Sequence, residues 1–183
     1  MFKIRYTIPS IEYYDEDINE FIEYPTKILD VNLEHSLVAI SKWEAKHHKP
    51  FFSNNEMTID DTLDYICCMD SSETLKIEDV KRLPQSILDG IQDYIKDPMT
   101  ATTFSDDKIA PNRDIITSEV IYYDMVAAQI PFECQYWHIN RLLTLIRIYS
   151  IKSSPPKKMS KSEILARNRR LNAERRAKYH TKG

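Results

Sequence analysis

The first thirty residues alternate apolar and polar positions in a way that indicates β-strands. KIRYTI (3–8) is a short alternating run with β-branched residues, and Pro9 follows it. IEYYDEDINEFIEY (11–24) predicts a second strand, or a hairpin that turns at the acidic DED, and Pro25 ends it. We therefore expect a small β element over residues 1–31.

From Asn32 the apolar positions change to helical spacing. The pattern predicts a first helix with Asn32 as its N-cap, closed by Pro50 after HHK. Its apolar stripe consists of Leu33, Leu37, Ile40 and Trp43. We expect this helix to turn that stripe toward a core.

Two further short helices follow in the same pattern. TIDDTLDYICCM begins with Thr58 or Asp60 near its cap, and its expected apolar face holds Ile59, Leu63, Ile66 and Cys67. QSILDGIQDYIKD stops before Pro98, and its expected face holds Ile87, Ile91, Tyr94 and Ile95. Residues 99–114 have turn residues and no period, which predicts a loop.

The segment from Thr117 to Pro131 predicts another helix. Thr117 is placed as the N-cap, Glu119 lies in the first turn, and Ile116 and Ile121 have the spacing of a hydrophobic staple.

Pro131 can begin the next helix, FECQYWHINRLLTLIRIYSIK, because proline costs no hydrogen bond at that position. Its two adjacent apolar stripes are Phe132, Tyr136, Ile139, Leu143 and Ile146, and beside them Leu142, Leu145 and Tyr149. A helix that is apolar around more than half its girth is our candidate for the central buried helix.

The last part of the chain is different in character. SSPP (153–156) predicts a linker, and Ser160 with Glu163 forms a capping box at the start of a helix with a thin apolar stripe. We expect an α+β fold, mainly α-helical, with an N-terminal β element (1–31), a helical body (32–150) and a basic linker with a C-terminal helix (151–183).

Charge divides the chain more sharply than its formal total of −3 suggests. Residues 152–183 hold eleven Lys and Arg against two Glu, net +9, and the remainder is net −12. A basic arm can bind nucleic acid in a salt-dependent way, or it can dock on an acidic protein surface. The acidic body favours docking, since it would repel DNA. The helix has no Trp or Phe to insert into a membrane, so we expect no membrane partner.

Composition argues against catalysis and metal binding. Two glycines leave little room for phosphate-cradling loops, and no Walker, Rossmann or GxSxG pattern is present. Cys134 and His138 are four residues apart, and Cys67, Cys68, His47 and His48 are also available, but the chain has no CxxC or HExxH. We therefore predict no enzyme activity, no cofactor and no metal. The N-terminus lacks the features of a secretory signal, which predicts a cytoplasmic protein with reduced thiols.

Aromatic and basic side chains are the remaining candidates for contacts with a partner. Trp43 and Trp137 could stack on bases, although their place in apolar stripes favours core packing. Arg141 and Arg147 lie in the most apolar segment, so we expect them to pair with a carboxylate or to face an interface. The candidate partner-binding residues are Trp43, Trp137, Arg141, Arg147, Lys157, Lys158, Arg167, Arg169, Arg170, Arg175 and Arg176.

Several strings together resemble a known family. They are SLVAISKWEAKHHKPFF (36–52), DPMTATTF (97–104), RDIITSEVIYYDM (113–125), IPFECQYWHINRLLTLIR (130–147) and PPKKMSKSEILARNRRLNAERR (155–176). These strings resemble the tail assembly chaperones that long-tailed bacteriophages encode beside the tape measure gene. The resemblance covers roughly residues 33–183 and is densest in the last part of the chain. Trp43, Trp137, Arg141 and the basic stretch from Lys157 lie in the matching strings.

The resemblance implies a non-enzymatic assembly factor in the host cytoplasm. Such a factor would bind the tape measure protein, keep this long helical client in solution, and help tail tube subunits polymerise around it during virion assembly. Self-association is a further expected protein–protein interaction, through docking of the basic tail on the acidic body of a neighbouring copy. Two alternatives remain: a structural tail or baseplate protein of the virion, and a nucleic-acid-binding accessory protein that acts through the basic tail.

Overall fold

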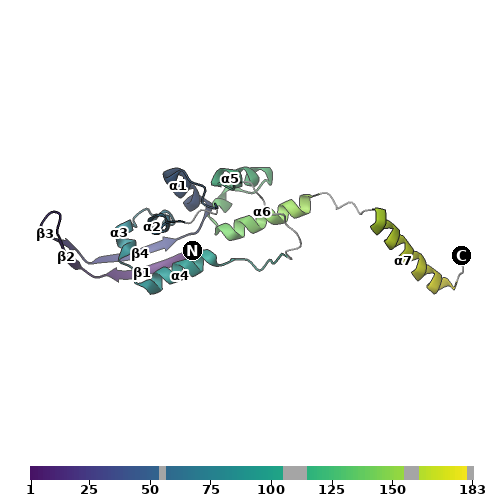
Figure 1. Ribbon diagram of the computed structural model, residues 1–183, viewed down its shortest axis with the longest axis horizontal. Coiled ribbons are helices and arrows are strands. Elements are labelled where there is room, and N and C mark those ends of the chain that lie inside the picture. The colour runs from purple at the N-terminus through teal and green to yellow at the C-terminus, as the bar shows by residue number, and fades with distance from the viewer. Residues whose placement is uncertain (54–56, 105–114, 155–160, 181–183) are drawn as a thin grey trace. The chain divides into compact units, whose positions relative to one another are not determined.

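The computed structural model describes residues 1–53, 57–104, 115–154 and 161–180, apart from the side chain of Tyr13. The chain divides into two compact units, residues 1–150 and 151–183. The first contains four strands and most of the helices, and the second contains one long helix (Figure 1). The predicted class, α+β and mainly α-helical, is confirmed.

The β element is an antiparallel ribbon that consists of two successive two-stranded ladders. β1 (Phe2–Ile8) pairs with β4 (Lys27–Leu33), and β2 (Ile11–Asp15) pairs with β3 (Glu20–Tyr24). The two ladders are separated at Pro9 on one side of the ribbon and Pro25 on the other, because proline has no N–H to donate. The predicted hairpin over 11–24 is confirmed, and it forms the distal part of the ribbon (Figure 1).

The predicted start of the first helix was wrong. KILDVNL forms β4, so Asn32 and Leu33 belong to a strand. Helix α1 (Leu37–His47) begins at Ser36, whose side chain accepts a hydrogen bond from the Ala39 backbone N–H. Leu33 is nevertheless buried, because alternate residues of β4 face the same core as the helical stripe.

The next helices follow the predicted segments. α2 (Ile59–Cys68) begins with a capping box between Thr58 and Asp61, a short α3 (Ile77–Lys81) follows, and α4 (Gln85–Lys96) ends before Pro98. On the predicted face of α2, Ile66 is buried and Leu63 and Cys67 pack against the core, but Ile59 is exposed. Asp61, Asp64 and Tyr65, which were not predicted to face inward, are buried as well. The helix is rotated so that its carboxylates meet basic groups of α1.

The predicted central buried helix is two separate elements. After α5 (Ser118–Ala127) comes a 3-10 helix, η1 (Phe132–Tyr136), and then α6 (Ile139–Ser153). The break lies at Trp137, whose backbone is extended, and at His138, which forms an isolated β-bridge with Ser36. On α6 the fully buried residues are Ile139 and Leu142, so this helix lies on the edge of the body rather than at its centre.

The core lies between the β1–β4 ribbon and the helices. Ile4, Ile8, Leu29 and Val31 point inward from the ribbon, and α4 packs alongside β1, where the Phe2 and Tyr94 rings are 5.8 Å apart. Helix α1 packs against three other helical elements, α2, α5 and η1. A buried cluster of His35, Tyr65 and His138 joins the start of α1 to α2 and α6.

The second unit carries α7 (Lys161–Tyr179), which has no buried residue. The predicted basic C-terminal helix is therefore confirmed as a helix over this range. Its capping residue Ser160 and the two prolines of the SSPP linker lie outside the described residues, as does most of the predicted loop over 99–114.

Candidate interaction surfaces

Trp43 belongs to the core. Its side chain is 2% exposed, and its indole N–H donates a hydrogen bond to the Asp61 carbonyl at 3.0 Å. The ring stacks on His47 at a centroid distance of 4.5 Å. Trp43 thus fixes α1 against α2, and a contact with a partner would require this packing to open.

A charged cluster lies between α1 and α2. Asp64 is buried and accepts hydrogen bonds from Lys46 and from His47 Nε2, the latter at 2.8 Å. Burial raises the pKa of Asp64, but the hydrogen bonds from Lys46 and His47 outweigh that effect and leave the pKa below its ordinary value. Each member has a partner from the neighbouring helix, which is the pattern of a structural network.

Arg141 and Arg147 do not occupy the surroundings that the apolar sequence predicts. Arg141 is exposed and lies over the Trp137 ring at 4.0 Å, and Arg147 lies over the Phe104 ring at 3.9 Å. Neither guanidinium forms an ion pair within the described ranges. Among the described residues the guanidinium groups stack on rings instead of pairing with a carboxylate, which leaves each with donors for a further ligand, and the alternative that they face an interface stays a prediction.

Arg147 lines a shallow cleft between α6 and the segment that follows α4. The cleft encloses about 360 Å³, and its wall also includes Phe104, Asn140 and Thr144. The Asn140 side-chain amide donates to the Asp97 carbonyl at 2.7 Å, so this end of α4 is tied directly to α6.

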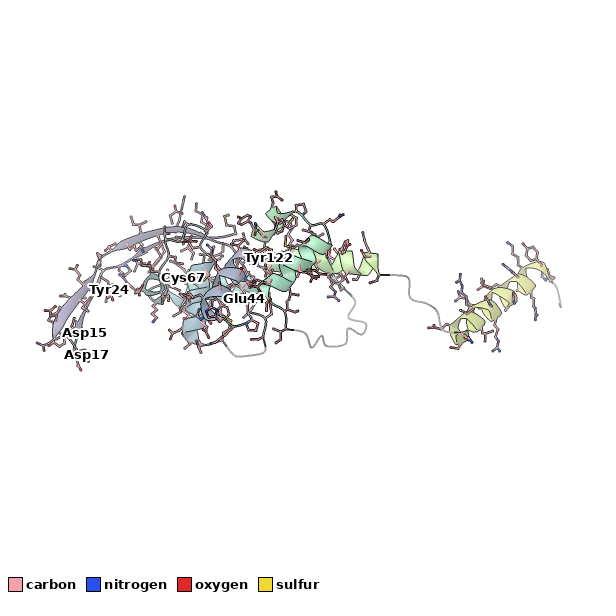
Figure 2. The ribbon with its side chains drawn as sticks, turned by 90° about the horizontal axis from the view of Figure 1, so that it is seen from above. Asp15, Asp17, Tyr24, Glu44, Cys67 and Tyr122 are labelled. Carbon is pink, nitrogen blue, oxygen red and sulfur yellow. The ribbon has the colours of Figure 1, made fainter. Side chains whose placement is uncertain are left out.

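The N-terminus of α5 is held by a carboxylate from another helix. Glu44, a buried residue of α1, accepts hydrogen bonds from the backbone N–H of Ser118 and of Phe51, both at 2.7 Å (Figure 2). Thr117 is the N-cap residue, as predicted, but its side chain makes no capping hydrogen bond. Glu119 lies in the first turn as predicted, and hydrogen bonds from its own backbone N–H and from Thr117 lower its pKa, so Glu44 is a second anion at this helix end, from a residue distant in sequence.

The side of α5 that faces away from the core is apolar and exposed. We define the α5 face as Val120, Tyr123 and Val126, whose exposed fractions are 42%, 71% and 58%. Ile121 and Met125 on the other side of the helix are buried, so α5 is apolar on both sides but packed on one. Phe132 and Tyr136 of η1, which follows α5 in the chain, are also exposed.

The residues of the α5 face were not among the predicted partner-binding residues. The signal was present, since SEVIYYDMVA has apolar residues on both sides of the helix, interrupted only by Ser118, Glu119 and Asp124. A helix of that kind is either fully buried or contacts a partner, and the pattern alone does not distinguish these cases.

The basic candidates on α7 are all exposed to solvent. Arg170 pairs with Glu174 at 3.6 Å along the helix. Arg167, Arg169, Arg175 and Arg176 lie on the same helix, whereas Lys157 and Lys158 lie outside the described residues.

Neither a metal centre nor a membrane span is found in the described ranges. They contain no group of three or more His, Cys, Asp or Glu side chains that could hold a metal ion. No helix within them combines the length and apolar character needed to cross a bilayer. Burial raises the pKa of the Cys67 thiol to about 12 and that of Cys68 to about 11, and the nearby Asp64 charge adds to both shifts. Both thiols are therefore in their protonated form at neutral pH.

Comparison of the chain with protein-family models, with curated proteins and with solved structures found no match.

Proposed function

We propose that this protein is a non-enzymatic tail assembly chaperone of a long-tailed bacteriophage. It binds the tape measure protein in the host cytoplasm and assists the assembly of the tail tube around it. The proposal is supported by the resemblance of residues 33–183 to that family. The structural observation that carries it is the exposed α5 face.

A chaperone for a long helical client needs apolar surface with a polar rim, rather than catalytic groups. An amphipathic helix binds such a surface through apolar side chains spaced three or four residues apart. The α5 face offers matching positions at Val120, Tyr123 and Val126, and Glu119 and Asp124 on the same helix provide polar neighbours. One such contact is small, but many copies along one client hold it through avidity.

The test is co-expression with the tape measure protein of the same phage. We expect full-length protein to keep the client in the soluble fraction. A variant of the α5 face, Val120→Gln with Tyr123→Gln and Val126→Gln, removes three apolar contacts worth about 1 kcal/mol each and should weaken client binding roughly a hundredfold. These side chains are exposed, so the variant should keep its fold.

A matched control separates the α5 face from a general loss of apolar surface. Ile28→Gln with Ile59→Gln changes two other exposed apolar residues, on β4 and α2, and should leave client solubility unchanged. A client that stays insoluble with the full chain would contradict the chaperone proposal, and the protein should then be sought in purified virions as a structural part. Equal rescue by both variants would contradict the assignment of the α5 face.

A further inference from the structure

The hairpin over residues 11–24 carries an unusual concentration of negative charge. It contains six carboxylates and no Lys or Arg, so it accounts for half of the net charge of −12 found outside the basic C-terminal stretch. We call this segment the acidic hairpin; its carboxylates are Glu12, Asp15, Glu16, Asp17, Glu20 and Glu23. Asp15 and Asp17 lie at its tip, and Tyr24 lies at its base (Figure 2).

The strand register places like charges opposite each other. Glu12 pairs with Glu23 across the ladder, and Asp15 pairs with Glu20. Directly opposed like charges destabilise an antiparallel pair, and the hairpin offers no internal cation to offset them. The acidic hairpin is therefore a surface that a cationic partner would stabilise.

The same face carries aromatic rings. Tyr14 pairs with Phe21 in the register, two residues along from the Glu12–Glu23 pair, so both pairs share one face of the ribbon. The two rings lie 5.0 Å apart, and both are exposed. Carboxylates beside exposed rings suit arginine more than lysine. A guanidinium group can pair with a carboxylate and can also stack on an aromatic ring.

The base of the hairpin is fixed to the body. The Arg82 guanidinium donates to the Pro9 carbonyl and lies over the Tyr24 ring at 5.5 Å. The two contacts involve both sides of the ribbon, at the point where Pro9 and Pro25 separate its two ladders. The acidic hairpin is thus presented on an anchored support.

Helix α7 supplies the complementary charge. Arg169 and Arg176 are seven residues apart on one side of the helix, and Arg175 adjoins them. The helix buries none of its residues, and a helix that is polar all round is marginal without a partner.

We propose that α7 of one copy docks on the acidic hairpin of a second copy of this chain. Charge complementarity and exposed rings favour this occupant, and the inference does not depend on the chaperone proposal. Within the 1–150 unit the hairpin and the end of α6 lie at opposite ends (Figure 1). A contact of α7 with the acidic hairpin of its own chain is the competing arrangement, and the mixing of two variants described below distinguishes it from a contact between copies.

The experiment uses two charge-reversed variants of the full chain. The hairpin variant is Glu12→Lys with Glu23→Lys, and the arm variant is Arg169→Glu with Arg176→Glu. Sedimentation equilibrium at about 50 mM salt measures self-association, which the screening of charges should weaken as salt rises. We expect wild-type chains to associate and each variant alone to associate at least tenfold more weakly.

Mixing the two variants is the decisive measurement. In the mixture the unchanged α7 of the hairpin variant meets the unchanged acidic hairpin of the arm variant, so each pair of unlike chains regains one wild-type contact. We expect association to return to within about threefold of wild type. A contact within one chain cannot be restored by mixing, so recovery assigns the partner to a second copy.

Three outcomes would overturn the proposal. They are a wild-type protein that stays monomeric at low salt, a mixture that does not recover, and a hairpin variant that associates like wild type. Glu78→Lys with Asp93→Lys gives the same change in net charge at exposed positions of α3 and α4, and should leave association unchanged. Circular dichroism of each variant checks that the fold is retained.

Discussion

At the scale of single residues, His35 is the most informative buried group. It is 4% exposed, its Nδ1 lies within hydrogen-bonding distance of the Tyr65 hydroxyl, and its ring meets the edge of His138 at 4.9 Å. Burial, and then the neighbouring His138, lower the pKa of His35 to about 3. The ring therefore packs in its neutral form. Sequence reasoning did not identify it, because an isolated histidine has no periodic signal.

This environment predicts that the protein loses stability in mild acid. Between pH 6.5 and about 3 the unfolded chain binds a proton at His35 that the folded chain does not, so the free energy of unfolding falls as pH falls. The expected loss is about 1.4 kcal/mol per pH unit in that window. Urea titrations from pH 7 to pH 5 measure it before the carboxylates begin to protonate.

The comparison that assigns this slope to His35 uses His35→Asn, which keeps a polar group near Tyr65. The variant should be less stable at pH 7 but should show a flatter dependence on pH, by about 1 kcal/mol per unit. His180→Asn, at an exposed position, should leave the slope unchanged. Equal slopes for wild type and His35→Asn would show that another group carries the acid sensitivity.

At the scale of elements, α5 shows how a helix end is stabilised from outside its own segment. Glu44 accepts from the Ser118 N–H and from the Phe51 N–H, and so joins α1, α5 and the chain that follows α1. Its charge lies at the positive end of the α5 dipole, where an anion is stabilising.

We expect Glu44→Gln to cost about 2 to 3 kcal/mol of stability, because an amide nitrogen cannot accept a hydrogen bond from a backbone N–H. Thr117→Ala should cost less, about 0.5 to 1 kcal/mol, since the Thr117 side chain makes no capping hydrogen bond to the backbone and only supports the Glu119 carboxylate. Urea denaturation at neutral pH measures both. A larger effect at Thr117 than at Glu44 would contradict the assignment of the cap.

Elements with a clear local period were predictable. α4 and the acidic hairpin follow the expected segments, because Pro98 and Pro25 end them and their patterns have one period. β4 was not predicted, because KILDVNL runs directly into the helical spacing of α1. The break at Trp137 and His138 was missed because a tertiary β-bridge, not a local signal, causes it.

The candidate surfaces were predictable only in part. The basic character of α7 follows from composition alone. Burial of Trp43 agrees with its place in the predicted stripe. Exposure of the α5 face and stacking of Arg141 depend on which side of each element the core occupies, and that is a property of the folded chain.

At the scale of the whole molecule, the two units should be thermodynamically independent. The chain divides at residue 150, and α7 contributes no buried side chain. We expect truncation after Ser150 to leave the melting temperature of the body within about 2 °C of the full chain, measured at high salt, where docking is screened. A drop of 10 °C or more would mean that the basic unit is part of the folding unit.

The opposed carboxylates of the ribbon have one more consequence. β2 and β3 form a two-stranded sheet, so each presents an unpaired edge together with apolar side chains such as Ile11 and Phe21. Edges of this kind are templates for uncontrolled stacking of strands into aggregates. Two hairpins that approached edge to edge would bring a dozen negative charges together. The same charges that can attract a basic helix therefore also protect the chain from edge-to-edge pairing of its hairpin strands.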